Sequence, residues 1–212
     1  MEMLKFVLFV GVSVSLIPGD AQLCCAPSQF QTFFDEMTSL SSERDKRFRT
    51  MMFSSDENSN KTAIHVIAQS EEDKYDRIDD YAAGKSYEWA RGTCYVGRTQ
   101  PNKQTCIPAE AKLVRRSFVG VSPNIVNVDT YMYTLGSGLV RYVTVGPNCT
   151  PVEVVVTTSK IPQPDGQFMW IFYNMTMGIK DPSIFTPPKI CFKEGSRVNG
   201  QPDFKPYWWS ML

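Results

Sequence analysis

The 212-residue sequence lacks the residues on which several common functions depend. It has one histidine, His65, so a metal site built from several histidines is excluded and any histidine-based catalytic pair must use this residue. Its 22 basic and 22 acidic side chains cancel, which argues against a generally basic nucleic-acid surface but not against a local patch. No nucleophile elbow, phosphate-binding glycine loop or metal-ligand spacing is present, although a pair of carboxylates could still catalyse acid–base chemistry. We therefore expect a binding protein rather than an enzyme, with no nucleic-acid partner and no cofactor of its own.

Long hydrophobic runs are also missing. The longest apolar stretch, residues 6–17, follows Lys5 and ends at Pro18-Gly19, and it is too short for a helix to cross about 30 Å of hydrocarbon. With the small residues Gly19 and Ala21 after it, the stretch is typical of a signal peptide over residues 1–21. A membrane anchor is the alternative. We expect cleavage after Ala21 and one secreted domain over residues 22–212, with no stable membrane span.

The cysteines agree with secretion. No CxxC pair occurs, which removes the spacing evidence for a zinc ribbon or a thioredoxin-like site. An even number of cysteines in an oxidising compartment predicts three disulfides, for which 15 pairings exist. A bond between adjacent Cys24 and Cys25 would strain the peptide between them, so each is expected to reach a distant partner. Three N-glycosylation sequons begin at Asn60, Asn148 and Asn174, as expected of a secreted glycoprotein.

Most of the chain has the pattern of short β-strands separated by turns. Glycine, proline and asparagine mark the separators at residues 136–138, 146–148 and 162–166. Regularly spaced strands of this kind predict an all-β antiparallel sandwich or barrel. Residues 30–40 have helical apolar spacing, but a strand is also possible there. The predicted strands cover residues 46–53, 62–68, 87–91, 93–96, 126–134, 139–145, 152–158 and 168–173.

The segment 168–173 is apolar on both faces of its predicted strand. Phe168, Trp170 and Phe172 share one face, whereas Met169, Ile171 and Tyr173 share the other. One face can pack on the core, and the other needs a second protein layer, a partner subunit or an apolar ligand. Asn174 is in phase with the aromatic face, so we expect the strand to end or bend there.

Two polar features have simpler interpretations. The acidic run Glu71-Glu72-Asp73, with Asp76, Asp79 and Asp80 after it, lacks the spacing and glycine of a calcium loop, so we interpret it as a solvated charged loop. His65 lies out of phase with the apolar face of its strand, with no Cys, Ser or second His beside it. We expect an exposed or hydrogen-bonded strand histidine.

A long segment near the end of the chain resembles a known family. Residues 178–191 read GIKDPSIFTPPKIC, in which Asp181-Pro182-Ser183 forms a turn, Ile184-Phe185 an apolar plug and Pro187-Pro188 a stiff link to Cys191. This segment closely resembles the C-terminal signature of the ependymin family, in particular the ependymin-related proteins. Weaker support comes from residues 24–27, 103–106 and 148–152.

The resemblance implies two curved antiparallel sheets, similar to bacterial lipoprotein carriers, around an apolar pocket, with one or two short helices. It further implies a secreted or lysosomal homodimeric glycoprotein that binds lipids or other hydrophobic molecules. Carried over by position, it implies the disulfides Cys106–Cys191 and, from the N-terminal pair, Cys24–Cys149. These leave Cys25–Cys94 as the third bridge. Which of Cys24 and Cys25 reaches Cys149 stays open.

The leading hypothesis is a carrier of apolar ligands. Its expected lining residues are Tyr131, Tyr133, Phe168, Trp170 and Phe172, with Met169 and Ile171 if the sheet faces are reversed. The alternative, also implied by the resemblance, is an extracellular-matrix or cell-adhesion glycoprotein that associates with calcium through its glycans. The terminal cluster Tyr207-Trp208-Trp209 could meet a partner or pack back on the fold.

Overall fold

The computed structural model describes residues 24–40, 47–67, 75–99, 106–135, 139–158, 166–193 and 197–199. The expected signal peptide, the acidic residues 71–73 and the cluster 207–209 lie outside this range. The described strands are β1 (Cys24–Cys25), β2 (Gln29–Leu40), β3 (Arg47–Asp56), β4 (Lys61–Ile67), β5 (Asp76–Asp80), β6 (Lys85–Ala90), β7 (Thr93–Arg98), β8 (Cys106–Ile107), β9 (Lys112–Val121), β10 (Asn124–Thr134), β11 (Leu139–Val145), β12 (Pro151–Thr158), β13 (Gly166–Met177) and β14 (Arg197–Asn199).

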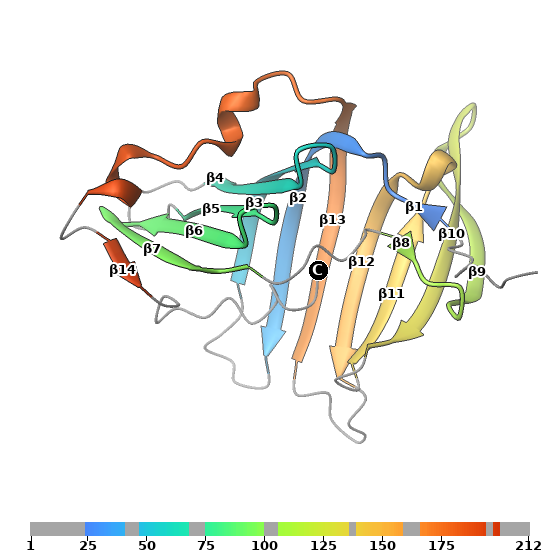
Figure 1. Cartoon of the computed structure of the whole chain (residues 1–212). Coiled ribbons are helices and arrows are strands. Elements are labelled where there is room, and N and C mark those ends of the chain that lie inside the picture. The colour runs from blue at the N-terminus through green and yellow to red at the C-terminus, as the bar shows by residue number, and fades with distance from the viewer. Residues whose placement is uncertain are drawn as a thin grey trace, which may run out of the picture.

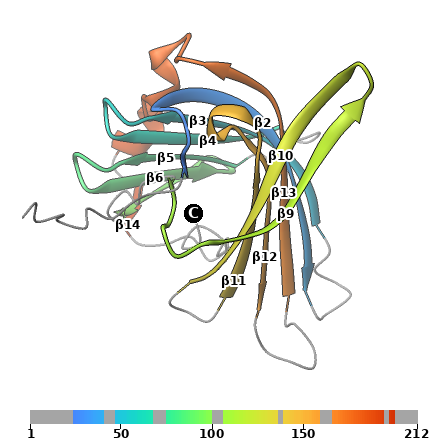
Figure 2. The ribbon, with the colours of Figure 1, turned by 90° about the vertical axis from the view of Figure 1, so that its right-hand side faces the viewer.

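The fold is all-β, as predicted, but the two expected sheets are one. Twelve strands form a continuous sheet in the order β14-β7-β6-β5-β4-β3-β2-β13-β12-β11-β10-β9, and β1 and β8 form a separate pair. Neighbours in the large sheet are antiparallel except for the parallel pair β14–β7. The long strands β2 and β13 pair directly at its centre, which joins the two halves that were expected to be separate. The sheet curves strongly, so that β3–β7 and β10–β13 enclose a concave side (Figures 1 and 2).

The helix considered for residues 30–40 is wrong, because the segment is the strand β2. Alternate side chains of β2 are buried, among them Phe30, Thr32, Phe34 and Glu36. This period of two belongs to a strand, and the extra apolar residue Phe33, which points to the opposite face, produced the apparent helical spacing. A second correction concerns the acidic run, since Asp76–Asp80 is the strand β5 rather than a solvated loop.

The two faces of β13 have different surroundings. Phe168 and Trp170 are buried on the concave side, whereas Ile171 and Tyr173 on the other face are 38% and 36% exposed. The strand does not end at Asn174 but shifts its register there, and Asn174 adopts a φ of 51°. This bulge leaves Asn174 exposed, which reconciles a sequon with an otherwise buried strand face.

The C-terminal segment covers the outer face of β4–β7 with two short 3-10 helices, η3 (Pro182–Phe185) and η4 (Lys189–Phe192) (Figure 1). The predicted turn begins η3, where the Asp181 carboxylate accepts a hydrogen bond from the Ser183 amide at 2.9 Å. The predicted plug is also confirmed, because Phe185 is 6% exposed and packs on Ala63 and Ile78.

Three disulfides are present, and one of the three expected pairings is among them. Cys24 bonds to Cys149, as expected. The expected Cys106–Cys191 and Cys25–Cys94 bridges are wrong, because the pairs are Cys25–Cys106 and Cys94–Cys191. The pairing of β1 with β8 places Cys25 directly opposite Cys106, at a Cα separation of 3.9 Å. Cys94 lies on the outer face of β7, where η4 brings Cys191 to a Cα separation of 5.0 Å.

Candidate functional site

The concave side of the sheet carries a continuous apolar surface, which we call the inner wall. It is built from strands on both sides of the β2–β13 pair and from the segment 106–111, which packs on it together with β1. Its buried members are Phe34, Met51, Ile64, Val66, Tyr75, Ile107, Ala111, Val143, Val145, Val154, Val156, Phe168 and Trp170. The pattern follows from alternation, since every second side chain of each contributing strand points to this side and most of these side chains are apolar.

All five predicted lining residues belong to the inner wall. Phe168 and Trp170 are buried in it, whereas Tyr131, Tyr133 and Phe172 pack against it and are half-buried. The structure therefore brings the predicted residues together on one face, with the buried pair in the core and the other three at the accessible margin. Their role in ligand binding stays a prediction.

The buried end of this group is held by a polar contact. Trp170 is 1% exposed, and its indole Nε1 donates a hydrogen bond to Glu36 Oε2 at 3.2 Å. Glu36 itself is 2% exposed. Because a buried indole needs an acceptor, this contact fixes Trp170 as a structural residue of the wall rather than a surface open to a ligand.

Arg141 brings a charge to the accessible margin. It lies on β11 between Tyr133 of β10 and Val156 of β12. Its Nη1 donates to the Tyr133 hydroxyl at 3.2 Å, and its Cζ lies 5.8 Å from the centre of that ring. Nε and Nη2 are buried and have no hydrogen-bond partner among the residues that the structure describes. Arg141 was not among the predicted site residues, although one arginine inside the apolar strand 139–145 is a usable signal.

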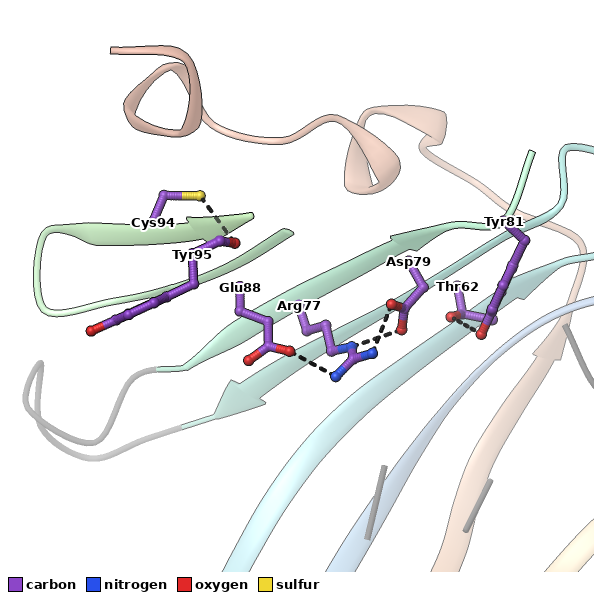
Figure 3. A network of polar contacts seen from close by, with 7 residues as sticks. All are labelled: Thr62, Arg77, Asp79, Tyr81, Glu88, Cys94 and Tyr95. Carbon is purple, nitrogen blue, oxygen red and sulfur yellow. Dashed lines mark hydrogen bonds and ion pairs between the residues drawn. The ribbon is translucent and has the colours of Figure 1, made fainter. Parts of the chain in front are cut away.

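A second polar group lies on the concave side of β5 and β6 (Figure 3). Arg77 donates from Nε and Nη2 to the two carboxylate oxygens of Asp79, at 2.7 and 2.8 Å, and from Nη1 to Glu88 at 2.7 Å. The three side chains lie side by side on the face of the sheet that points away from η3 and η4. Because the guanidinium is shared by two acids on neighbouring strands, this group joins β5 to β6.

Burial sets the protonation behaviour of this group. It raises the pKa of the Glu88 carboxyl despite the opposing charge of Arg77. It also raises the pKa of the Tyr75 hydroxyl, which lies beside Glu88. Burial alone would lower the pKa of Arg77, but the hydrogen bonds and the charge of Asp79 outweigh it and raise that pKa. The arrangement is that of a structural ion-pair network.

The remaining acids of β5 are also paired. His65 Nδ1 lies 2.8 Å from Asp76, so His65 is a hydrogen-bonded strand histidine, as expected. Lys61 lies 3.4 Å from Asp80. In the part of the chain that the structure describes, no group of three or more His, Cys, Asp or Glu residues is placed to hold a metal ion.

The three sequon asparagines share one geometry. Asn60, Asn148 and Asn174 are all exposed and all have a positive φ, of 53°, 55° and 51° respectively. Asparagine tolerates this left-handed conformation better than most residues do. At these three sites the conformation occurs at turns and bulges that project from the sheet. Each site is therefore accessible to a glycosylating enzyme, and glycan attachment stays a prediction.

The chain resembles known proteins in sequence and in fold. The model of the family described as Ependymin matches residues 69–191, which is more than half of the chain. The chain belongs to the ependymin family. The match includes Arg77, Glu88, Arg141 and the bridge Cys94–Cys191. No curated protein matches this ependymin-family chain.

Three solved structures align with the chain. An uncharacterized conserved protein from Thermus thermophilus aligns with a TM-score of 0.53 at 6% identity, over 82% of this chain and 91% of its own. A LolA superfamily protein from Nitrosomonas europaea aligns with a TM-score of 0.35 at 10% identity, over 76% of this chain and 92% of its own. A DUF1329 family protein from Desulfovibrio piger has a TM-score of 0.39 at 9% identity, over 76% of this chain and 90% of its own. The first likeness concerns the fold alone, and the other two are too weak to argue from.

Within the described ranges, the helices are short 3-10 turns, and none has the length and apolar content needed to cross a bilayer.

Proposed function

We propose that this ependymin-family protein is a secreted glycoprotein that binds a lipid or similar apolar molecule with an anionic head group on the concave side of its sheet. The observation that carries the proposal is Arg141, a guanidinium with two buried and unused N–H groups at the margin of an apolar wall. Secretion and glycosylation are supported by the family, the three disulfides and the exposed sequons.

One edge of the guanidinium supports an anionic head group. Nη1 is occupied by the Tyr133 hydroxyl, whereas Nε and Nη2, which share one edge, have no partner among the described residues. A carboxylate or phosphate accepts two parallel hydrogen bonds from such an edge. Leaving buried donors unsatisfied is costly, so an anion at this position would regain hydrogen bonds that the free protein lacks.

The half-buried aromatic side chains beside Arg141 support an apolar part of the ligand. Tyr131, Tyr133 and Phe172 offer accessible apolar surface continuous with the inner wall. Covering about 300 Å² of a hydrocarbon chain would be worth about 7 kcal/mol before the cost of association is subtracted. The apolar chain would therefore supply only part of the affinity, and hydrogen bonds from Arg141 to the head group would have to add to it.

The test compares two fluorescent probes that differ only in the head group, parinaric acid and its methyl ester. Arg141→Gln should weaken binding of the acid by about tenfold or more, because a hydrogen bond to a charged group is lost, and should leave the ester unchanged. The matched control is Arg98→Gln on β7, an exposed arginine, which should bind both probes like the wild type. Failure of the wild type to bind either probe would contradict the carrier function, and an equal loss of acid and ester would contradict the role of Arg141.

A further inference from the structure

The hairpin of β9 and β10 extends beyond the body of the sheet (Figure 2). β9 is the edge strand, and β10 pairs with β11 only from Asp129 onward. The preceding residues of β10 pair with β9 alone, and the pairing runs to Val121 opposite Asn124. Residues 118–127 therefore form a two-stranded ribbon that pairs with no third strand, which we call the tip, and Val128 below it is buried.

The tip is apolar on both faces. The pairing register places Val119, Val121 and Val126 on one face, and Phe118 and Ile125 on the other. All five side chains are open to solvent, with exposures of 52%, 78%, 46%, 63% and 49% in that order. An exposed cluster of large apolar residues indicates a contact surface, because it opposes solubility and adds nothing to the core.

Charge is arranged in a gradient along the same hairpin. No charged residue occurs between Ser117 and Val128. The base of β9 carries Lys112, Arg115 and Arg116, all exposed, against a single acid in the hairpin, Asp129. Arg116 lies 3.7 Å from Asp129 in a contact whose side chains are 77% and 39% exposed, so that it is weak in water.

The conformation of the tip depends on one glycine. Gly120 has a φ of +103°, and a Cβ atom added there would lie 2.2 Å from the Asn124 carbonyl oxygen. A side chain at this position is therefore excluded by the backbone itself, and the tight end of the ribbon is set by the sequence.

We propose that this hairpin docks the protein onto an anionic lipid bilayer, with the tip inserted between the head groups and the basic base held at their level. At about 3.4 Å per residue, Phe118 lies about 10 Å from Val121, and Arg116 about 17 Å. Interfacial segments enter a bilayer by about 5–10 Å, and the head-group layer adds several ångströms more. Inserting the tip as far as Phe118 would thus place Arg115 and Arg116 among the lipid phosphates.

A bilayer fits the tip better than a second protein chain does. A protein partner with one flat surface would cover one apolar face of the ribbon and leave the other in water, whereas a bilayer surrounds both. Arg115 and Arg116 also match an anionic surface, because a cation near such a surface raises the affinity by about fivefold. The inference is independent of the ligand on the concave side, because no residue of the hairpin tip belongs to the inner wall.

The experiment is flotation of the full-length secreted protein with vesicles of phosphatidylcholine, alone or with 30% phosphatidylserine. We expect binding to the anionic vesicles that weakens with salt. The tip variant Phe118→Ser with Val121→Ser should lower it at least tenfold. The base variant Arg115→Gln with Arg116→Gln should lower it about 25-fold on anionic vesicles, at about fivefold per charge.

Matched controls alter the same residue types elsewhere. Phe48→Ser with Met177→Ser removes apolar side chains that are 65% and 60% exposed on other strands, and Lys180→Gln with Lys193→Gln removes two exposed cations. Both should bind vesicles like the wild type, and circular dichroism should show every variant folded. Sedimentation of the wild type and the tip variant without lipid then shows whether each is a monomer or a dimer.

Three outcomes would overturn the proposal. The first is no binding of the wild type to anionic vesicles. The second is binding that the tip variant retains. The third is a wild-type dimer that the tip variant converts to a monomer without any vesicle binding, which would assign the hairpin to a second copy of the chain. Probe binding at Arg141 is measured without vesicles, so failure of either proposal leaves the other testable.

Discussion

The β3–β4 and β9–β10 hairpins are similar in length and apolar content but opposite in their surroundings. In the middle of β3–β4 both faces hold buried side chains, with Met51 and Ile64 at 0% and 1% exposure on the concave side and Ser54 and Ala63 at 0% and 1% on the outer side. In the tip of β9–β10 both faces are open, and Val121 reaches 78% exposure.

The difference between the hairpins lies in their neighbours rather than in their residues. The strands β2 and β5 flank β3–β4, and η3 packs over its outer face. β9 has no strand beyond it within the described sheet, and the tip extends past the end of its pairing with β11. An apolar pattern therefore predicts that a surface will be covered, but it does not say whether the cover is the protein itself.

The largest expected effect comes from uncovering the outer face of the buried half. Replacing both Cys94 and Cys191 by Ser opens a bridge between residues separated by 97 positions and releases η4 from β7. We expect a loss of about 4–5 kcal/mol in the free energy of unfolding, measured by denaturant titration, in the chain-entropy account. Vesicle binding by the hairpin should survive wherever the variant is folded. A loss below about 1 kcal/mol would contradict the view that this bridge secures the C-terminal cover.

A direct comparison of the two hairpins should give the next largest effect. Ile64→Ala removes a buried side chain from the inner wall and should cost about 2–5 kcal/mol. Val121→Ala, at the tip, should change the free energy of unfolding by no more than about 0.5 kcal/mol. Both are measured by denaturant titration. Equal losses would mean that the tip contributes to the folded core after all.

Much of the fold could be predicted because its strands alternate regularly. The strand 139–145 was placed with its observed bounds, and the C-terminal plug at Ile184-Phe185 followed from local turn chemistry. The strand β9 was missed, since its mixture of basic and apolar residues follows no inside–outside alternation. The number of sheets was also beyond local reasoning, because it depends on the contact between β2 and β13, which are more than 100 residues apart.

The candidate site also has a part that could be predicted from the sequence and a part that could not. The aromatic members of the inner wall were found because they occupy alternate positions of their strands, so that one face gathers them. Arg141 was missed because its importance depends on what lies across the strand pair, where Tyr133 uses one of its nitrogen atoms and leaves the others unpaired. The bridges Cys25–Cys106 and Cys94–Cys191 depend on the β1–β8 register and on the position of η4. No local pattern specifies either.

The smallest expected effect is a dependence of stability on pH. It should come from the buried half of the molecule and not from the exposed hairpin. The Glu88 side chain is 9% exposed, and burial raises its pKa above that of an unfolded chain, even with Arg77 at 2.7 Å. The native state therefore binds a proton at Glu88 more readily than the unfolded state does. The contribution of Glu88 to the free energy of unfolding must therefore fall as the pH rises from 4.5, the ordinary pKa of a glutamate, through the raised pKa.

Glu88→Gln removes this titration, so the wild-type free energy of unfolding minus that of Glu88→Gln should decrease as the pH rises. Urea titrations between about pH 4.5 and 7.5 measure it, a window that begins at the ordinary pKa of a glutamate. Ser86→Ala, a buried and non-titrating neighbour on the same strand, is the matched control, and its profile should stay parallel to that of the wild type. A difference that grows with pH would mean that the attraction of Arg77 outweighs burial at Glu88, and that β5 and β6 are held together more strongly as the carboxylate ionises.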